Sequence, residues 1–130
     1  MNNSKVFLIG LGVLLIAVAA LAFFRTHQGP IEPGKYDQFA MCLKDKGATF
    51  YGAFWCPHCQ AQKKMFGSSV SLLPYVECST PDAKSQTQIC IDKNIKSYPT
   101  WEFADGSRLT GEISLAELSG KTSCALPAEQ

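Results

Sequence analysis

The sequence has little net charge, few histidines and only one closely spaced cysteine pair. Its 12 Lys and Arg and 11 Asp and Glu leave a formal net charge of +1, so the charge balance gives no reason to expect a nucleic-acid partner. There is no second Cys-x-x-Cys and no His-x-x-x-His to complete a structural zinc site. The sequence also lacks internal repeats and low-complexity segments. At 130 residues, the chain allows one small domain and an appendage.

The one Cys-x-x-Cys lies where a strand predicted over 49–55 runs into a helix predicted over 57–66. The strand is indicated by an apolar, aromatic-rich run, and the helix by Pro57, a residue favoured in a first helical turn. The unpaired N–H groups and positive dipole end of a helix N-terminus favour a thiolate there. We therefore expect Cys56, at the exposed end, to form a mixed disulfide and Cys59, one turn inside, to resolve it.

His58 lies between the two cysteines, where it can donate a hydrogen bond to the Cys56 sulfur and add positive potential when protonated. Both effects stabilise the reduced form and make the disulfide the stronger oxidant. Haem attachment requires a histidine directly after the second cysteine, and Gln60 stands there instead. A zinc site and a purely structural disulfide remain as alternatives to a redox pair.

Residues 6–24 carry no charge. An apolar helix of this length reaches about 28 Å, close to the hydrocarbon thickness of a bilayer. Residues 1–25 are therefore predicted to be a transmembrane signal anchor, with a cleaved signal peptide as the alternative. Six cysteines in so short a chain suggest an oxidising compartment. The expected location is a single pass through the cell membrane, with the C-terminal domain on the extracytoplasmic side.

Residues 26–35, which hold two glycines and two prolines, are predicted to be a linker. Gly47 suits the end of the first helix of the domain, and Ser114 with Glu117 forms a capping-box pattern. Hydrophobic spacing and turn residues predict an α/β domain of order α-β-α-β-α-β-β-α. Its elements are expected over 36–46, 49–55, 57–66, 73–78, 83–93, 100–103, 108–110 and 114–119.

Two motifs carry a family resemblance. The segment 54–59, followed by a lysine-bearing helix, resembles a thioredoxin-fold active site, and 97–100 resembles the cis-proline segment that faces the cysteines in that fold. Further stretches resemble the thioredoxin-like domain associated with bacterial vitamin K epoxide reductase homologues. These stretches are 51–55, 75–79, 89–90 and 98–102. The resemblance covers about 36–119 and implies a reduced thioredoxin-like fold, of about four strands flanked by helices, for a domain spanning 36–126.

The resemblance also implies roles around the cysteines. A cis bond before Pro99 would present the Tyr98 backbone to an extended substrate, which could pair with it by strand addition. Trp55, Pro57 and Tyr98 are the expected substrate-binding residues. Cys56, Cys59, His58 and Pro99 are the expected catalytic residues.

The other four cysteines allow three pairings among themselves. Cys78 ends a predicted strand and Cys90 lies in the following helix, and the resemblance supports their pairing. Cys42 and Cys124 are then left to form a structural disulfide. For the Cys78–Cys90 pair, a structural disulfide and a second redox pair that relays electrons both remain open.

One position departs from common thioredoxins. Six residues before the first active-site cysteine, those proteins usually carry a buried aspartate that helps to deprotonate the resolving thiol, and here the residue is Phe50. Glu77 or Glu102 could substitute, but the sequence does not place them. The loss fits an oxidant better than a reductase.

The sequence thus predicts a membrane-anchored thiol-disulfide oxidoreductase that introduces disulfides into exported proteins. By resemblance, a membrane quinone reductase of the vitamin K epoxide reductase type would reoxidise it. Quinone would belong to that partner, and the chain itself is expected to bind no cofactor, metal or nucleic acid and to be a monomer. The alternatives are a disulfide reductase or isomerase with the same site, and a redox-inert extracellular binding module held by three disulfides.

Overall fold

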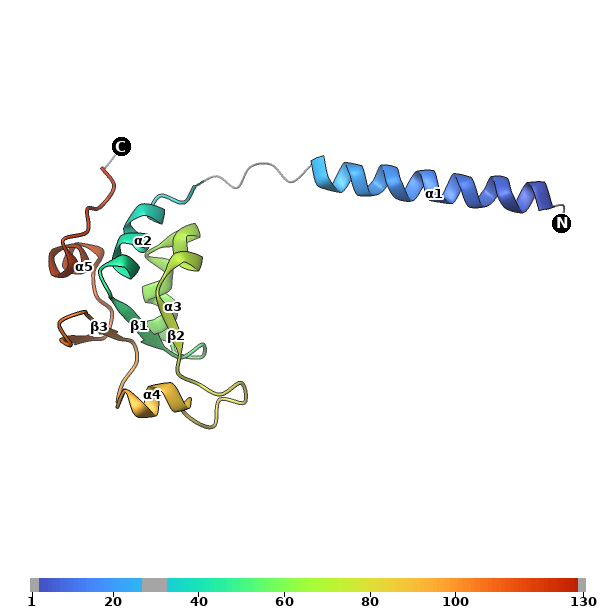
Figure 1. Cartoon of the computed structure of the whole chain (residues 1–130). Coiled ribbons are helices and arrows are strands. Elements are labelled where there is room, and N and C mark those ends of the chain that lie inside the picture. Colours follow the sequence, from blue (N-terminus) through green and yellow to red (C-terminus); the bar gives the residue numbers. More distant parts are fainter. Residues whose placement is uncertain (1–2, 27–32, 129–130) are drawn as a thin grey trace. The chain divides into compact units, whose positions relative to one another are not determined.

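The computed structural model describes residues 3–26 and 33–128, and the chain divides into two units, residues 1–32 and 33–130. The first unit contains helix α1 (Asn3–Thr26) (Figure 1). Within the described ranges, no helix combines the length and the apolarity that a bilayer crossing requires. The membrane-spanning role predicted for 6–24 is therefore not supported. Most of the predicted linker, 27–32, lies outside the described residues.

The second unit is a mixed α/β domain built on a four-stranded sheet. Between Asp37 and Thr122, its helices and strands follow the predicted order, with one additional 3-10 helix, η1. The elements are α2 (Asp37–Asp45), β1 (Thr49–Gly52), α3 (Pro57–Lys64), η1 (Gly67–Leu72), β2 (Tyr75–Glu77), α4 (Gln88–Asp92), β3 (Thr100–Glu102), β4 (Arg108–Thr110) and α5 (Leu115–Thr122).

The strands lie in the order β2-β1-β3-β4, with β1 parallel to β2 and the other neighbours antiparallel. Helices α2 and α4 lie near opposite ends of β1 (Figure 1). Gly52, the last residue of β1, pairs with Glu77, the last residue of β2. The connection to α3 therefore leaves the middle of the sheet directly beside the end of β2.

The main core packs aromatic side chains around β1. Phe50 is fully buried and stacks on Trp101 of β3 with ring centroids 4.9 Å apart. It also contacts Tyr75 edge-on at 5.2 Å. Such aromatic pairs add about 0.5–1.5 kcal/mol beyond their burial. Phe50 therefore has a packing role at the position where the sequence lacks an aspartate.

Two turns of the domain depend on local side-chain chemistry. Gly47, directly after the C-cap of α2, has φ +74°, a conformation that glycine adopts without strain. In the β3–β4 hairpin, the Asp105 carboxylate accepts hydrogen bonds from the backbone and hydroxyl of Ser107 and pairs with Lys121. These hydrogen bonds, those of Ser107 first, lower the pKa of Asp105 to about 2.

Several element boundaries differ from the sequence prediction, those of β1 and α4 among them. Strand β1 ends at Gly52 rather than at residue 55, because the chain turns through Phe54 and Trp55 before α3. Helix α4 begins at Gln88 rather than at residue 83, since Ala83 has a left-handed φ of 57°. The preceding loop is instead held by side-chain hydrogen bonds around Thr80. Helix η1 lies between the predicted elements 57–66 and 73–78, where no element was predicted.

Candidate active site

The candidate site is built where the chain turns from β1 into α3. The backbone N–H of Cys56 donates to the carbonyl of Ala53 at 3.0 Å, which closes this turn. Cys56 is the N-cap of α3, with an extended ψ of 120°, and Pro57 follows in the first helical turn. Proline is tolerated there because its missing N–H has no intrahelical acceptor. The sequence thus fixes Cys56 at the start of the helix and Cys59 one turn inside.

Both cysteines of the pair are free thiols, and both are buried. Cys56 is 6% exposed and Cys59 1%. Cys56 is therefore less exposed than the sequence analysis expected, because the Tyr98–Pro99 segment packs over it. Cys56 is nonetheless the more accessible of the two, and its neighbours Trp55, Pro57 and His58 are exposed.

Burial dominates the acidity of the inner thiol. It raises the pKa of Cys59 to about 12 from the ordinary 9.0, because a thiolate there would lose its hydration. The neighbouring Cys56 adds to this increase, whereas a backbone hydrogen bond with Ala53 and the positive charge of Lys63 oppose it. Near neutral pH the free Cys59 sulfur is therefore almost entirely a thiol. For Cys59 to attack a disulfide or to leave from one, neighbouring groups must therefore stabilise the Cys59 thiolate.

A cis peptide bond faces the pair. The bond between Tyr98 and Pro99 is cis, and the Cys56 thiol donates to the carbonyl oxygen of Tyr98 at 3.8 Å. Pro99 is fully buried and its carbonyl accepts from the backbone of Gly111. The cis bond thus brings the Tyr98 backbone onto the outer cysteine. An extended substrate that pairs with the Tyr98 backbone would therefore lie next to the Cys56 sulfur.

Two aromatic side chains, those of Trp55 and Tyr98, belong to the two segments that meet at Cys56. Trp55 is 48% exposed, and its ring meets that of Tyr98 edge-on at 6.1 Å. The indole N–H donates to the hydroxyl of Ser79 at 2.8 Å, so the ring is held although half its surface is free. Tyr98 in turn accepts from the amide of Gln86 through its hydroxyl. The predicted substrate-binding residues Trp55 and Tyr98 therefore form one fixed aromatic rim.

His58 makes a different contact from the predicted one. Its Nδ1 lies 2.6 Å from the carboxylate of Glu112, in the loop between β4 and α5, and not against the Cys56 sulfur. The His58 side chain lies in the first turn of α3 and is 71% exposed. The predicted hydrogen bond to Cys56 is thus replaced by a contact between the His58 ring and the Glu112 carboxylate at the surface.

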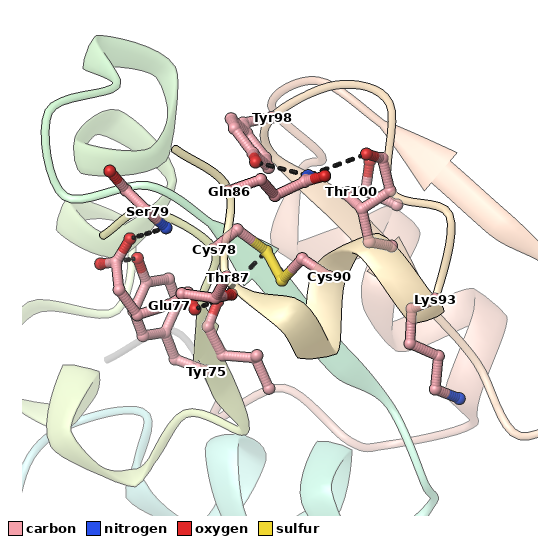
Figure 2. Close-up of a disulfide and its surroundings, with 12 residues drawn as sticks. Tyr75, Glu77, Cys78, Ser79, Gln86, Thr87, Cys90, Lys93, Tyr98 and Thr100 are labelled. Atoms are coloured by element: carbon pink, nitrogen blue, oxygen red, sulfur yellow. Dashed lines mark hydrogen bonds between the residues drawn. A yellow bond between two sulfur atoms is a disulfide. The ribbon is translucent and has the colours of Figure 1, made fainter. Parts of the chain in front are cut away.

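The remaining four cysteines form two disulfides. Cys42 on α2 bonds to Cys124 after α5, and Cys78 at the end of β2 bonds to Cys90 on α4. Figure 2 shows the disulfide between Cys78 and Cys90. Both cysteines are fully buried, in one cluster with Tyr51. Neither sulfur is open to solvent, which is the environment expected of a structural disulfide.

The two carboxylates that could replace the missing aspartate lie in different surroundings. Glu102 on β3 pairs with Lys93 and Arg108 at the edge of the sheet. Glu77 on β2 accepts hydrogen bonds from the backbone of Phe54, next to the active-site turn, and from Tyr75. Of these two carboxylates, only Glu77 is therefore hydrogen-bonded to the turn that carries Cys56. In the sequence, the spacing of four residues between Cys59 and Lys63 places the two on one face of α3. This spacing could have indicated a charged neighbour of the inner thiol.

No cluster of three or more potential metal ligands from His, Cys, Asp and Glu occurs among the described residues. Of the predicted site residues, the structure brings together Cys56, Cys59, Trp55, Tyr98 and Pro99. His58 contacts Glu112 instead. Cys78 and Cys90 lie in a buried cluster against which Tyr98 packs, and Cys124 belongs to the main core together with Cys56 and Cys59.

Comparisons with known proteins agree with this geometry. No protein-family model matches the chain. Over 110 residues, which are 82% of this chain, it is 42% identical to the thiol-disulfide oxidoreductase LTO1 of Arabidopsis thaliana. The chain spans only 29% of that protein. It is therefore homologous to a segment of a thiol-disulfide oxidoreductase.

Proposed function

We propose that this chain is a thiol-disulfide oxidoreductase that works through the Cys56–Cys59 pair in a thioredoxin-like domain. The observation that carries the proposal is the pair of free thiols at the start of α3, the outer one in contact with the carbonyl before cis-Pro99. The other four cysteines are already paired. The similarity to a protein named for this activity supports the same conclusion. So does the strand order β2-β1-β3-β4, with α3 following β1.

The proposed reaction is a two-step exchange. A substrate thiolate attacks the Cys56 sulfur of the Cys56–Cys59 disulfide, and Cys59 leaves with the bonding electron pair. A second substrate thiolate then attacks the substrate sulfur of the mixed disulfide, and Cys56 leaves. The substrate loses two electrons and gains a disulfide, and the enzyme pair is reduced to two thiols.

We propose that the pair works as an oxidant in the cell. Two disulfides in the same small domain fit an oxidising compartment, where such bonds persist. Phe50 gives the inner thiol no acidic neighbour at the position where common thioredoxins have one. With a pKa near 12, Cys59 is a poor nucleophile at neutral pH. Exported proteins with free thiols are the proposed substrates.

Reoxidation requires an electron acceptor, and the chain itself is proposed to bind no cofactor. We propose a membrane quinone reductase of the vitamin K epoxide reductase type, as the sequence resemblance suggests, with quinone bound by that partner. The proposed location is the extracytoplasmic side of a cell membrane. Anchoring through residues 6–24 stays a prediction, which extraction of membranes at alkaline pH would test. A monomer is likewise the proposed state.

The reduction potential tests the direction of electron flow. Known pairs of this kind run from about −270 mV for reductants to about −120 mV for the strongest oxidants. We expect a value above about −180 mV when the Cys56–Cys59 pair is equilibrated with glutathione buffers. A value near or below about −270 mV would support the reductase. A chain whose Cys56 does not react with an alkylating agent after mild reduction would be an inert binding module.

A further inference from the structure

The inner thiol has a cationic neighbour that the proposed exchange does not yet use. Lys63 lies one helical turn after Cys59 on α3, so the two side chains share one face of the helix. Its ammonium nitrogen is 3.3 Å from the centroid of the Tyr75 ring. A cation over an aromatic face is attracted to the ring, and more strongly when it is shielded from water. This contact holds a side chain that would otherwise extend into solvent.

The Tyr75 ring also lies against the inner thiol. A Cβ placed on Gly52 would be 2.9 Å from the Cys59 sulfur and 3.0 Å from a ring carbon of Tyr75. Both groups therefore occupy the space over Gly52 that a side chain would fill. The ring that holds the Lys63 ammonium is thus the ring that packs beside the Cys59 sulfur.

Glu77 fixes the Tyr75 ring in that place. One carboxylate oxygen accepts from the Tyr75 hydroxyl at 2.7 Å, and the other accepts from the backbone of Ser79 at 2.9 Å and of Phe54 at 3.2 Å (Figure 2). Burial, followed by the hydrogen bond to Glu77, raises the pKa of Tyr75, so the phenol stays neutral. No negative charge on Tyr75 therefore competes for the Lys63 ammonium.

We propose that Lys63 is a positioning residue whose ammonium stabilises the Cys59 thiolate when that thiolate forms, with Tyr75 and Glu77 holding the ammonium in place. The cluster lies beside the position that Phe50 occupies, because Phe50 pairs with Tyr75 across β1 and β2. The positive charge comes from Lys63 on α3, and the residues that hold it, Tyr75 and Glu77, lie on β2. The inference rests on the proposed redox role of the pair.

The charges around Cys59 agree with this role. Burial lowers the pKa of Lys63, whereas Glu77 and Cys59 itself raise it, so the lysine and the inner thiol each favour the other's charged form. Cys56 is the one group with the opposite effect on the Cys59 anion. When Cys56 is bonded to substrate, that opposing charge is gone, while the Lys63 ammonium and the backbone hydrogen bond with Ala53 still favour the anion.

The stabilised thiolate serves both directions of exchange. When substrate attacks Cys56, the Cys56–Cys59 bond breaks and Cys59 leaves as the anion next to Lys63. When a mixed disulfide is resolved, the Cys59 thiol loses its proton to solvent and attacks the Cys56 sulfur, and the bound thiol leaves. Exchange is faster when the leaving thiolate is more stable, and attack is faster when more of the thiol is ionised.

Reaction with 5,5′-dithiobis(2-nitrobenzoate) separates the two cysteines. The reduced full-length protein releases one nitrothiobenzoate when Cys56 attacks the reagent, and a second when Cys59 resolves the mixed disulfide. We expect Lys63→Met to leave the first phase within twofold of wild type and to slow the second about threefold. That estimate takes a tenfold loss of thiolate, partly offset by its higher nucleophilicity.

Two further variants make the result specific. Lys63→Arg keeps the charge and is expected to restore the second phase to within twofold of wild type. Lys64→Met is the matched control, because Lys64 is the next residue on α3 but is exposed, and both of its phases should match wild type. A second phase that is unchanged in Lys63→Met, or that Lys63→Arg fails to restore, would overturn the inference. Absence of the second phase in wild type would instead refute the redox pair itself.

Discussion

The two disulfides of the domain should contribute unequally to stability, and the loop lengths give the size of the difference. Cys42 and Cys124 are 82 residues apart in sequence, and Cys78 and Cys90 are 12 apart. In the chain-entropy model, a cross-link restricts the unfolded chain in proportion to the logarithm of the loop length. These separations correspond to about 4.5 kcal/mol for the long loop and about 2.8 kcal/mol for the short one.

Paired substitutions to alanine test this difference directly. Cys42→Ala with Cys124→Ala should lower the free energy of unfolding by about 1.7 kcal/mol more than Cys78→Ala with Cys90→Ala, on the same loop-entropy model. Guanidinium denaturation followed by tryptophan fluorescence measures both. With a denaturant slope of about 3 kcal/mol/M, the two midpoints should differ by about 0.6 M.

The burial of the cysteines could reverse the order. Cys78 and Cys90 are both fully buried, whereas Cys42 is only partly buried, so alanine leaves a larger unfilled volume at the short loop. A cavity term of about 1–2 kcal/mol there would cancel the entropic difference. If the Cys78–Cys90 variant is the less stable one, the loop-entropy reasoning is refuted, and packing of the native state decides the contribution.

Three further changes test other parts of the structure. Gly52→Ala should destabilise the protein by about 1–3 kcal/mol in denaturant, because the added methyl group meets the Cys59 sulfur at 2.9 Å, whereas Gly120→Ala, which meets nothing within 4 Å, should not. Since the Ser107 hydrogen bonds lower the pKa of Asp105 from 3.8 to about 2, its stabilising effect is full above pH 3.8 and is lost as the pH falls to 2. Wild type and Asp105→Asn should therefore differ in thermal midpoint at pH 6 and converge at pH 2, and a constant difference would contradict this. Since burial raises the pKa of Cys59 from 9.0 to about 12, the reduced protein should lose stability relative to Cys59→Ala as the pH rises above 9.

The sequence predicted the elements whose causes are local. The helix start at Pro57, the glycine after α2 and the Ser114 cap, which accepts from the backbone of Glu117 at 3.1 Å, all occur as expected. Each depends on one residue and its immediate neighbours. The boundary of α4 was wrong because the hydrogen bonds of Thr80 and the left-handed Ala83 outweigh a stretch that is otherwise permissive for a helix.

The parts of the site that the sequence could not place depend on contacts between distant segments. The burial of Cys56 results from Tyr98, which is 42 residues away. His58 meets Glu112, 54 residues away, and no periodic pattern relates them. Glu77 reaches the backbone of Phe54 only because β2 pairs with β1 in parallel. Strand register, which hydrophobic alternation does not specify for strands of three or four residues, decides which carboxylate joins the site.

Trapping of mixed disulfides tests the central claim most directly. With Cys59→Ser, an intermediate formed on Cys56 cannot be resolved, so a substrate protein should remain covalently attached and be released by dithiothreitol. With Cys56→Ser, no such adduct should form, because the remaining Cys59 thiol is 1% exposed and has a pKa raised by burial. Adducts in the first variant and none in the second are the predicted result. Equal trapping by the two variants, or trapping by neither, would contradict the assignment of Cys56 as the sulfur that meets substrate.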